Sequence, residues 1–116
     1  MATSAEYIEY AAERVKQCGI SEEIRFRKMF GEYMLYAADR PVLLVCDDTV
    51  FVKMLPELES VFGGRAVQKG VPYPGAKEHF ILDIDDGELV RAVVSELVRV
   101  TPVSGSKNKN KKEGQM

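Results

Sequence analysis

The sequence contains one histidine and two cysteines among its 116 residues. His79 has no second histidine with which to share a metal ion, and Cys18 and Cys46 lie far apart without a C-x-x-C spacing. We therefore expect neither a metal site nor a redox-active cysteine pair, and we expect no cofactor. The two cysteines are expected to be free thiols that are buried or half-buried.

Long apolar runs are also missing. No stretch approaches the roughly 20 residues that a membrane-spanning helix needs. The first six residues have neither the basic stretch nor the apolar segment of a secretory signal. We therefore expect no membrane partner and a cytoplasmic location. A chain of this length is expected to form one domain, with enough buried surface for a core of its own.

Charge is unevenly distributed along the chain. Residues 105–116 carry four lysines and one glutamate, a net charge of +3, which leaves −5 for residues 1–104 out of the total of −2. We expect residues 1–103 to form the folded domain and residues 104–116 a disordered, lysine-rich tail, because the tail has no apolar side chain before Met116. The acidic domain argues against autonomous, tight binding of duplex DNA.

Apolar periodicity predicts helices over residues 3–18 and about 89–100. Pro56 at the start and Gly63-Gly64 at the end predict a short helix over residues 57–62. Thr3 is expected to cap the first helix in a capping box, and Asp85 to start the last one. Each of these side chains would accept a hydrogen bond from a backbone N–H group of the first helical turn.

Strand signals fill much of the remaining chain. The expected strands are Ile24–Phe30, Tyr33–Ala38, Val42–Cys46, Thr49–Lys53, a brief edge strand at 66–69, and 79–84. Short turns at Asp39-Arg40-Pro41 and Asp47-Asp48 favour an antiparallel meander. The order is thus one helix, three to four strands, a short helix, one or two strands and a helix. It predicts a two-layer α+β fold in which the helices pack on one antiparallel sheet.

His79 is the only candidate general base of the histidine type. Glu78 and Asp83 are close to it in sequence, but a general base also needs an orienting partner and a substrate pocket. We interpret His79 as structural and keep a small enzyme centred on it as an alternative.

Acidic residues form two small groups, Asp47-Asp48 and Asp83, Asp85 and Asp86. They lack the D-x-D-x-D-G spacing of a calcium loop. We therefore interpret them as turn and helix-cap residues, with no bound metal.

A basic cluster, Arg25, Arg27 and Lys28, is interleaved with aromatic residues. This combination is typical of single-stranded nucleic-acid binding. The alternative is a solvated strand face in front of core aromatics, which we favour because strand aromatics mostly serve the core. A nucleic-acid binder that uses this cluster and the lysine tail remains an open alternative.

Three motifs occur in series. The first is Arg27-Lys28-Met29-Phe30-Gly31-Glu32-Tyr33, the second runs from Cys46 to Lys53 as C-D-D-T-V-F-V-K, and the third is Pro72-Tyr73-Pro74-Gly75-Ala76-Lys77 followed by a strand. In this order they resemble the N-terminal domain of the TfoX/Sxy family, over about residues 5–101. The resemblance implies an α-β-β-β-α-β-β-α fold similar to that of secretion chaperones. It also implies a non-enzymatic role, since these proteins act as transcriptional coactivators of DNA-uptake competence genes together with the cyclic-AMP receptor protein.

The first and third motifs supply the candidate partner surface. Its residues are Met29, Phe30, Gly31, Tyr33, Tyr73, Pro74, Gly75 and Lys77. Turns joined to aromatic residues are places where a loop or sheet edge can present side chains. We expect a protein partner such as a transcription factor. A homodimer could form through a free sheet edge or the apolar final helix.

Overall fold

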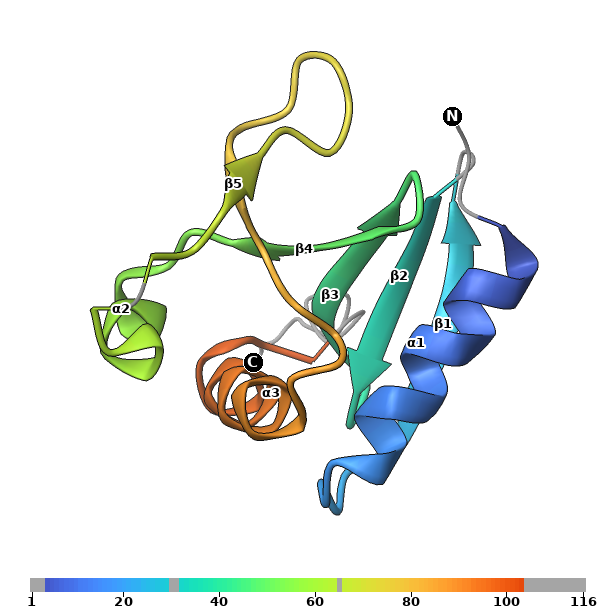
Figure 1. Cartoon of the computed structure of the whole chain (residues 1–116). Coiled ribbons are helices and arrows are strands. Elements are labelled where there is room, and N and C mark those ends of the chain that lie inside the picture. Colours follow the sequence, from blue (N-terminus) through green and yellow to red (C-terminus); the bar gives the residue numbers. More distant parts are fainter. Residues whose placement is uncertain (1–3, 30–31, 65, 104–116) are drawn as a thin grey trace, which may run out of the picture.

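The computed structural model of the protein describes residues 4–29, 32–64 and 66–103 (Figure 1). The expected tail, 104–116, lies outside the described residues. The elements in chain order are α1 (Ala5–Gln17), β1 (Ile24–Met29), β2 (Glu32–Ala37), β3 (Arg40–Cys46), β4 (Thr49–Lys53), α2 (Pro56–Phe62), β5 (Lys69–Gly70), β6 (His79–Ile81) and α3 (Gly87–Val100). This order confirms the predicted α+β fold, with four strands between α1 and α2.

The six strands form one sheet in the order β1-β2-β3-β4-β6-β5, with antiparallel neighbours throughout. Tight turns join β2 to β3 and β3 to β4. Both central residues of each turn have positive φ: 52° and 63° at Ala38 and Asp39, and 54° at both Asp47 and Asp48. Such turns match the twist of antiparallel strands. The predicted meander and the Asp47-Asp48 turn are therefore confirmed.

The first of these turns differs from the expectation. Arg40 and Pro41 do not form the turn, because they already belong to β3 and pair with Ala37 and Tyr36. The register of β2 and β3 shifts between Leu35 and Tyr36. Such an irregularity can accommodate a proline, which has no N–H group for the ladder.

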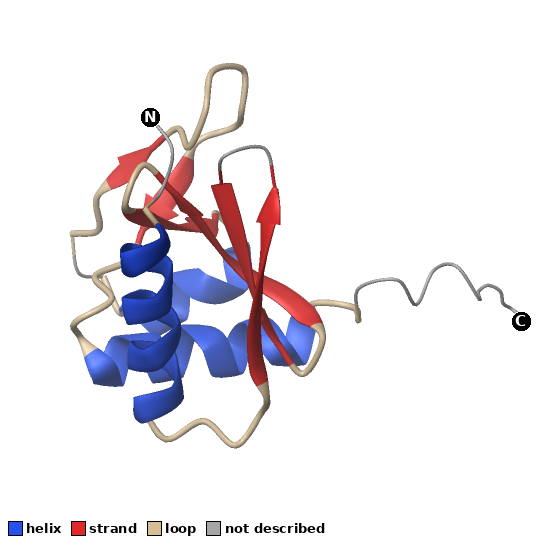
Figure 2. Cartoon of the chain, turned by 90° about the vertical axis from the view of Figure 1, so that its right-hand side faces the viewer, coloured by secondary structure: helices blue, strands red, loops and turns tan. Residues whose placement is uncertain are grey.

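The helices form the second layer. α1 contacts β1 and α3, α3 contacts β3, and α2 contacts α3. Figure 2 shows α1 lying beside the long strands, with the other helices behind it. The core between the layers is made of aliphatic residues with two phenylalanines, Phe62 and Phe80, whose rings meet edge to face at 4.8 Å. These buried side chains include Ile8, Val15, Leu35, Leu43, Val45, Val50, Val52, Leu58, Val90, Val93 and Val94.

Two helix caps lie one residue later than expected. The Ser4 hydroxyl accepts the backbone N–H of Tyr7 at 3.1 Å and caps α1, whereas Thr3 lies outside the described residues. The Asp86 carboxylate accepts the backbone N–H of Leu89 at 3.2 Å and caps α3. The prediction of Asp85 as the cap was wrong: its carboxylate instead accepts a hydrogen bond from the hydroxyl of Tyr10 on α1.

Candidate binding groove

A groove of about 730 Å³ opens over one face of the sheet. In β2, β3 and β4 this face is opposite the one that carries the core residues Leu35, Leu43 and Val52. Its floor is a row of three side chains in register, Met34 opposite Leu44 and Leu44 opposite Phe51. Alternation along each strand places these residues on the face away from Leu35 and Leu43, which are fully buried in the core. The strand pattern that builds the core therefore also builds the apolar floor.

The loop between β5 and β6 forms one wall. Its tip is a four-residue turn in which the Ala76 N–H donates to the Tyr73 carbonyl at 3.0 Å. Pro74 and Gly75 occupy the two central positions, and Gly75 has a φ of 89°. Proline followed by a residue with positive φ is typical of a type II turn. Gly75 thus supplies the positive φ that the third position of such a turn requires.

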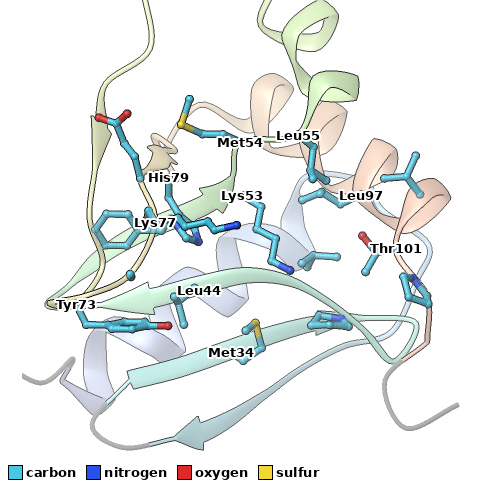
Figure 3. A pocket seen from close by; sticks show the side chains of 17 residues that line it. Met34, Leu44, Lys53, Met54, Leu55, Tyr73, Lys77, His79, Leu97 and Thr101 are labelled. Carbon is cyan, nitrogen blue, oxygen red and sulfur yellow. The ribbon is translucent and has the colours of Figure 1, made fainter. Parts of the chain in front are cut away.

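The C-terminal end of α3 forms the opposite wall, with Leu97, Val100, Thr101 and Pro102. Arg40 anchors this wall to the start of β3, because its Nε donates to the Thr101 carbonyl at 2.9 Å. Figure 3 shows Met34 and Leu44 below, Tyr73 on one side, and Leu97 and Thr101 on the other.

Basic side chains project into this groove. Lys53 on β4 lies directly opposite His79 on β6, and Lys77 precedes that strand. Figure 3 shows the ends of Lys53 and Lys77 between the two walls, with the His79 ring beside Lys77. Glu78 is the acidic residue among those that line the groove, so its ionisable lining is predominantly basic.

The His79 ring is fixed by two contacts. Its Nδ1 lies 2.8 Å from the Lys77 carbonyl oxygen. Because a carbonyl oxygen only accepts hydrogen bonds, Nδ1 carries a hydrogen and donates it to this oxygen. The ring also meets the Phe51 ring edge to face, with 6.3 Å between centroids.

Asp83, which is close to His79 in sequence, has a different partner. Its carboxylate accepts the backbone N–H of Asp85 at 3.0 Å, within the turn before α3.

The structure divides the predicted partner surface. Tyr73 and Lys77 line the groove, and Pro74 and Gly75 are exposed at the loop tip. Tyr33 instead packs against the core, with its ring 5.7 Å from that of Phe26. The remaining members are Met29, at the half-buried end of β1, and Phe30 and Gly31, which lie outside the described residues.

The predicted basic cluster is divided as well. Strand alternation places Arg25 and Arg27 on one face of β1 and Lys28 on the other. Arg25 forms an ion pair with Asp39. Arg27 lies opposite Met34, next to the row that forms the groove floor. The three cations therefore do not form one patch on β1.

Sequence reasoning did not single out the groove residues Lys53, Leu44 and Leu97. Lys53 ends the second motif, and the alternation of β4 places it on the same face as Phe51. That alternation could have predicted that Lys53 lies beside Phe51 on the face of β4 that points away from the core. Leu97 gave no such signal, because its pattern marks only the inner face of a helix.

Both cysteines are free thiols, with Cys18 half-buried and Cys46 buried, as predicted. Burial raises the pKa of each thiol above its usual value. Among residues 4–29, 32–64 and 66–103, no three His, Cys, Asp or Glu side chains are grouped so that they could hold a metal ion. Within the same ranges no helix is long and apolar enough to cross a membrane.

Comparison with known proteins gives a relative without an assigned activity. No family model matches the chain, and no solved structure matches it. The relative is described as the uncharacterized 12.7 kDa protein in the trpE 5' region of Spirochaeta aurantia. It is 37% identical to this chain over 101 residues, which cover 87% of this chain and 82% of the relative. The chain therefore belongs to the same family as this Spirochaeta aurantia protein.

Proposed function

We propose that this chain is a non-enzymatic protein-interaction domain of the TfoX N-terminal type, which regulates transcription in the cytoplasm through a protein partner. The series of three motifs supports this assignment. The relative from Spirochaeta aurantia is named for its position at trpE, and this name assigns no activity to it.

The observation that carries the proposal is the gathering of exposed apolar side chains around the groove. Met54 and Tyr73 line it and are 38% and 46% exposed, and Val71 on the same loop is 52% exposed. Exposed apolar and aromatic residues beside a concave surface are typical of protein contact sites. The contact surface in this proposal is thus the rim formed by the β5–β6 loop and Met54.

The test is affinity capture from lysate of the source cells, with the Tyr73→Ala/Lys77→Ala variant in parallel. We expect the parent chain to retain a protein partner after nuclease treatment and at moderate salt. We expect the variant to lose that partner while it keeps its far-UV circular dichroism and its thermal midpoint, because both side chains are exposed. A control is Lys16→Ala, which removes an exposed lysine from α1, away from the groove.

Capture by the variant at the parent level would contradict the surface assignment. Capture that disappears with nuclease or with salt would contradict the proposal and favour nucleic acid, because phosphate contacts weaken steeply as salt rises. Arg25→Gln and Arg27→Gln would then be the next variants.

A further inference from the structure

The groove holds a second chemical feature, a group of basic side chains, of which the protein-contact proposal uses Lys77 alone. Its floor is apolar, and Lys53, Lys77 and His79 line the same groove. We propose that the groove binds a small amphipathic carboxylate, a ligand with a hydrocarbon body and one anionic head group. This goes beyond the proposed function, since it assigns a small-molecule site to the domain.

Size and lining fit such a ligand. Ligand pockets usually measure roughly 300–1,000 Å³, with mostly apolar walls and a few polar groups that fix the orientation. The groove measures about 730 Å³. Met34, Leu44, Phe51 and Leu97 would contact the hydrocarbon body, while the basic groups bind the head.

Charge identifies the head group as anionic. Lys53 and His79 are directly opposite each other across β4 and β6. The ammonium group of Lys53 attracts an anion that binds beside this pair. Lys77 adds a third basic group from the loop. This basic lining stands out on a domain whose residues 1–104 carry a net charge of −5.

The sheet itself argues against an extended peptide in the same place. The backbone groups of the floor already pair in the β2–β3, β3–β4 and β4–β6 ladders. A peptide laid across this face would bury N–H and C=O groups without partners, at a cost of about 1–3 kcal/mol for each group. A hydrocarbon chain has no such groups. The chain's own residues 105–116 are also a poor occupant, because their net charge of +3 opposes that of the lining.

His79 shapes the head-group end of the groove. Its Nδ1–H donates to the Lys77 carbonyl at 2.8 Å, which holds the ring beside that loop and against Phe51. The ammonium groups of Lys53 and Lys77 are the donors for a carboxylate, because both lysines line the groove. Charge-assisted hydrogen bonds of this kind are roughly twice as strong as neutral ones.

The experiment is a titration of the purified full chain with decanoate, below its critical micelle concentration, followed by amide chemical shifts in NMR spectra. Decanol is the neutral probe of the same chain length. We expect decanoate to shift the amides of Leu44, Phe51 and Leu97 and to bind at least about tenfold more tightly than decanol. We expect Lys53→Gln/Lys77→Gln to weaken decanoate binding about tenfold and to leave decanol binding unchanged.

The matched control is Lys16→Gln/Lys28→Gln, which removes the same charge from exposed positions on α1 and β1. It should bind decanoate as the parent does. Equal affinity for decanoate and decanol, equal loss in the control variant, or no binding below the micelle concentration would each overturn the proposal. The titration uses no partner, so its failure leaves the protein-contact proposal unaffected.

Discussion

The thiol of Cys46 donates a hydrogen bond to the carbonyl oxygen of Pro72, with 2.9 Å between the sulfur and the oxygen. Cys46 is the last residue of β3, and Pro72 begins the P-Y-P-G-A-K loop. Both residues are buried. This contact ties the wall of the groove to its floor and joins two of the three sequence motifs in space.

Replacing Cys46 with alanine should loosen this wall. Cys46→Ala removes the donor and leaves the buried Pro72 carbonyl unsatisfied, so we expect the free energy of unfolding to fall by about 1–2 kcal/mol in urea titrations. We also expect faster hydrogen exchange at the Ala76 amide, which closes the loop turn. Cys18→Ala is the control, because Cys18 follows α1 and bonds to Val15. Unchanged exchange at Ala76 in the Cys46 variant would contradict this role.

Two thiols and one tyrosine hydroxyl predict a loss of folding stability at alkaline pH. Burial raises the pKa of Cys46, of Cys18 and of Tyr7, so the folded chain holds these protons more tightly than the unfolded chain does. Stability from the two thiols is complete below their unfolded pKa of about 8.5, and it is lost as the pH rises through their higher folded values.

The measurement is the urea concentration at the midpoint of unfolding, determined at several pH values from neutral to about pH 10. This range brackets the pKa of an unfolded cysteine, about 8.5. We expect it to fall above about pH 8.5, and to fall less in the Cys18→Ala/Cys46→Ala variant. A midpoint that rises over this range, or an identical slope in the variant, would show that the thiols are not protected by burial.

Local patterns predicted most of the fold. Runs of β-branched, aromatic and aliphatic residues identified most of the strands, and β4 was predicted to the residue as Thr49–Lys53. The turn before β3 was misplaced because Asp39 and Pro41 both suit turns. The two left-handed residues of the turn are instead Ala38 and Asp39. Alanine is not a residue type that signals a positive φ in a sequence. The start of β3 is set instead by sheet pairing, because Arg40 pairs with Ala37 and Pro41 pairs with Tyr36.

The groove was less accessible to sequence reasoning. It brings Leu44 of β3 and Tyr73 of the loop together with Leu97 of α3. These residues are far apart in the chain, and no local periodicity reports such contacts. Tyr33 belongs to the first motif but lies two residues before Leu35, so both side chains lie on the core face of β2.

Loss of the α3 cap should cost measurable stability. Asp86→Ala removes the carboxylate that accepts the Leu89 N–H, and we expect the free energy of unfolding to fall by about 1 kcal/mol. Asp86→Asn keeps a side-chain acceptor, so the free energy of unfolding of this variant should fall by only a few tenths of that amount. Urea titrations of the three proteins measure the difference. An Asp86→Ala variant as stable as the parent would contradict the assignment of the cap.

The last prediction separates the conformational role of Gly75 from its place in the groove wall. Gly75 and Gly63 have φ values of 89° and 62°, and among the described residues beyond their chain neighbours a Cβ on either would meet no atom within 4 Å. Alanine at either site is therefore strained by backbone conformation alone, and we expect a loss of about 1 kcal/mol in each variant. Asparagine tolerates positive φ better than alanine and should restore part of this stability.

Partner capture should distinguish the two sites. Gly75→Ala alters the turn that positions Tyr73 and Lys77, so we expect weaker capture, with recovery in Gly75→Asn. Gly63→Ala strains the end of α2, away from the loop, and should capture the partner at the parent level despite its similar stability loss. Full capture by Gly75→Ala would show that the type II turn is not needed for the contact. Equal loss in Gly63→Ala would show that capture follows global stability rather than the shape of the loop.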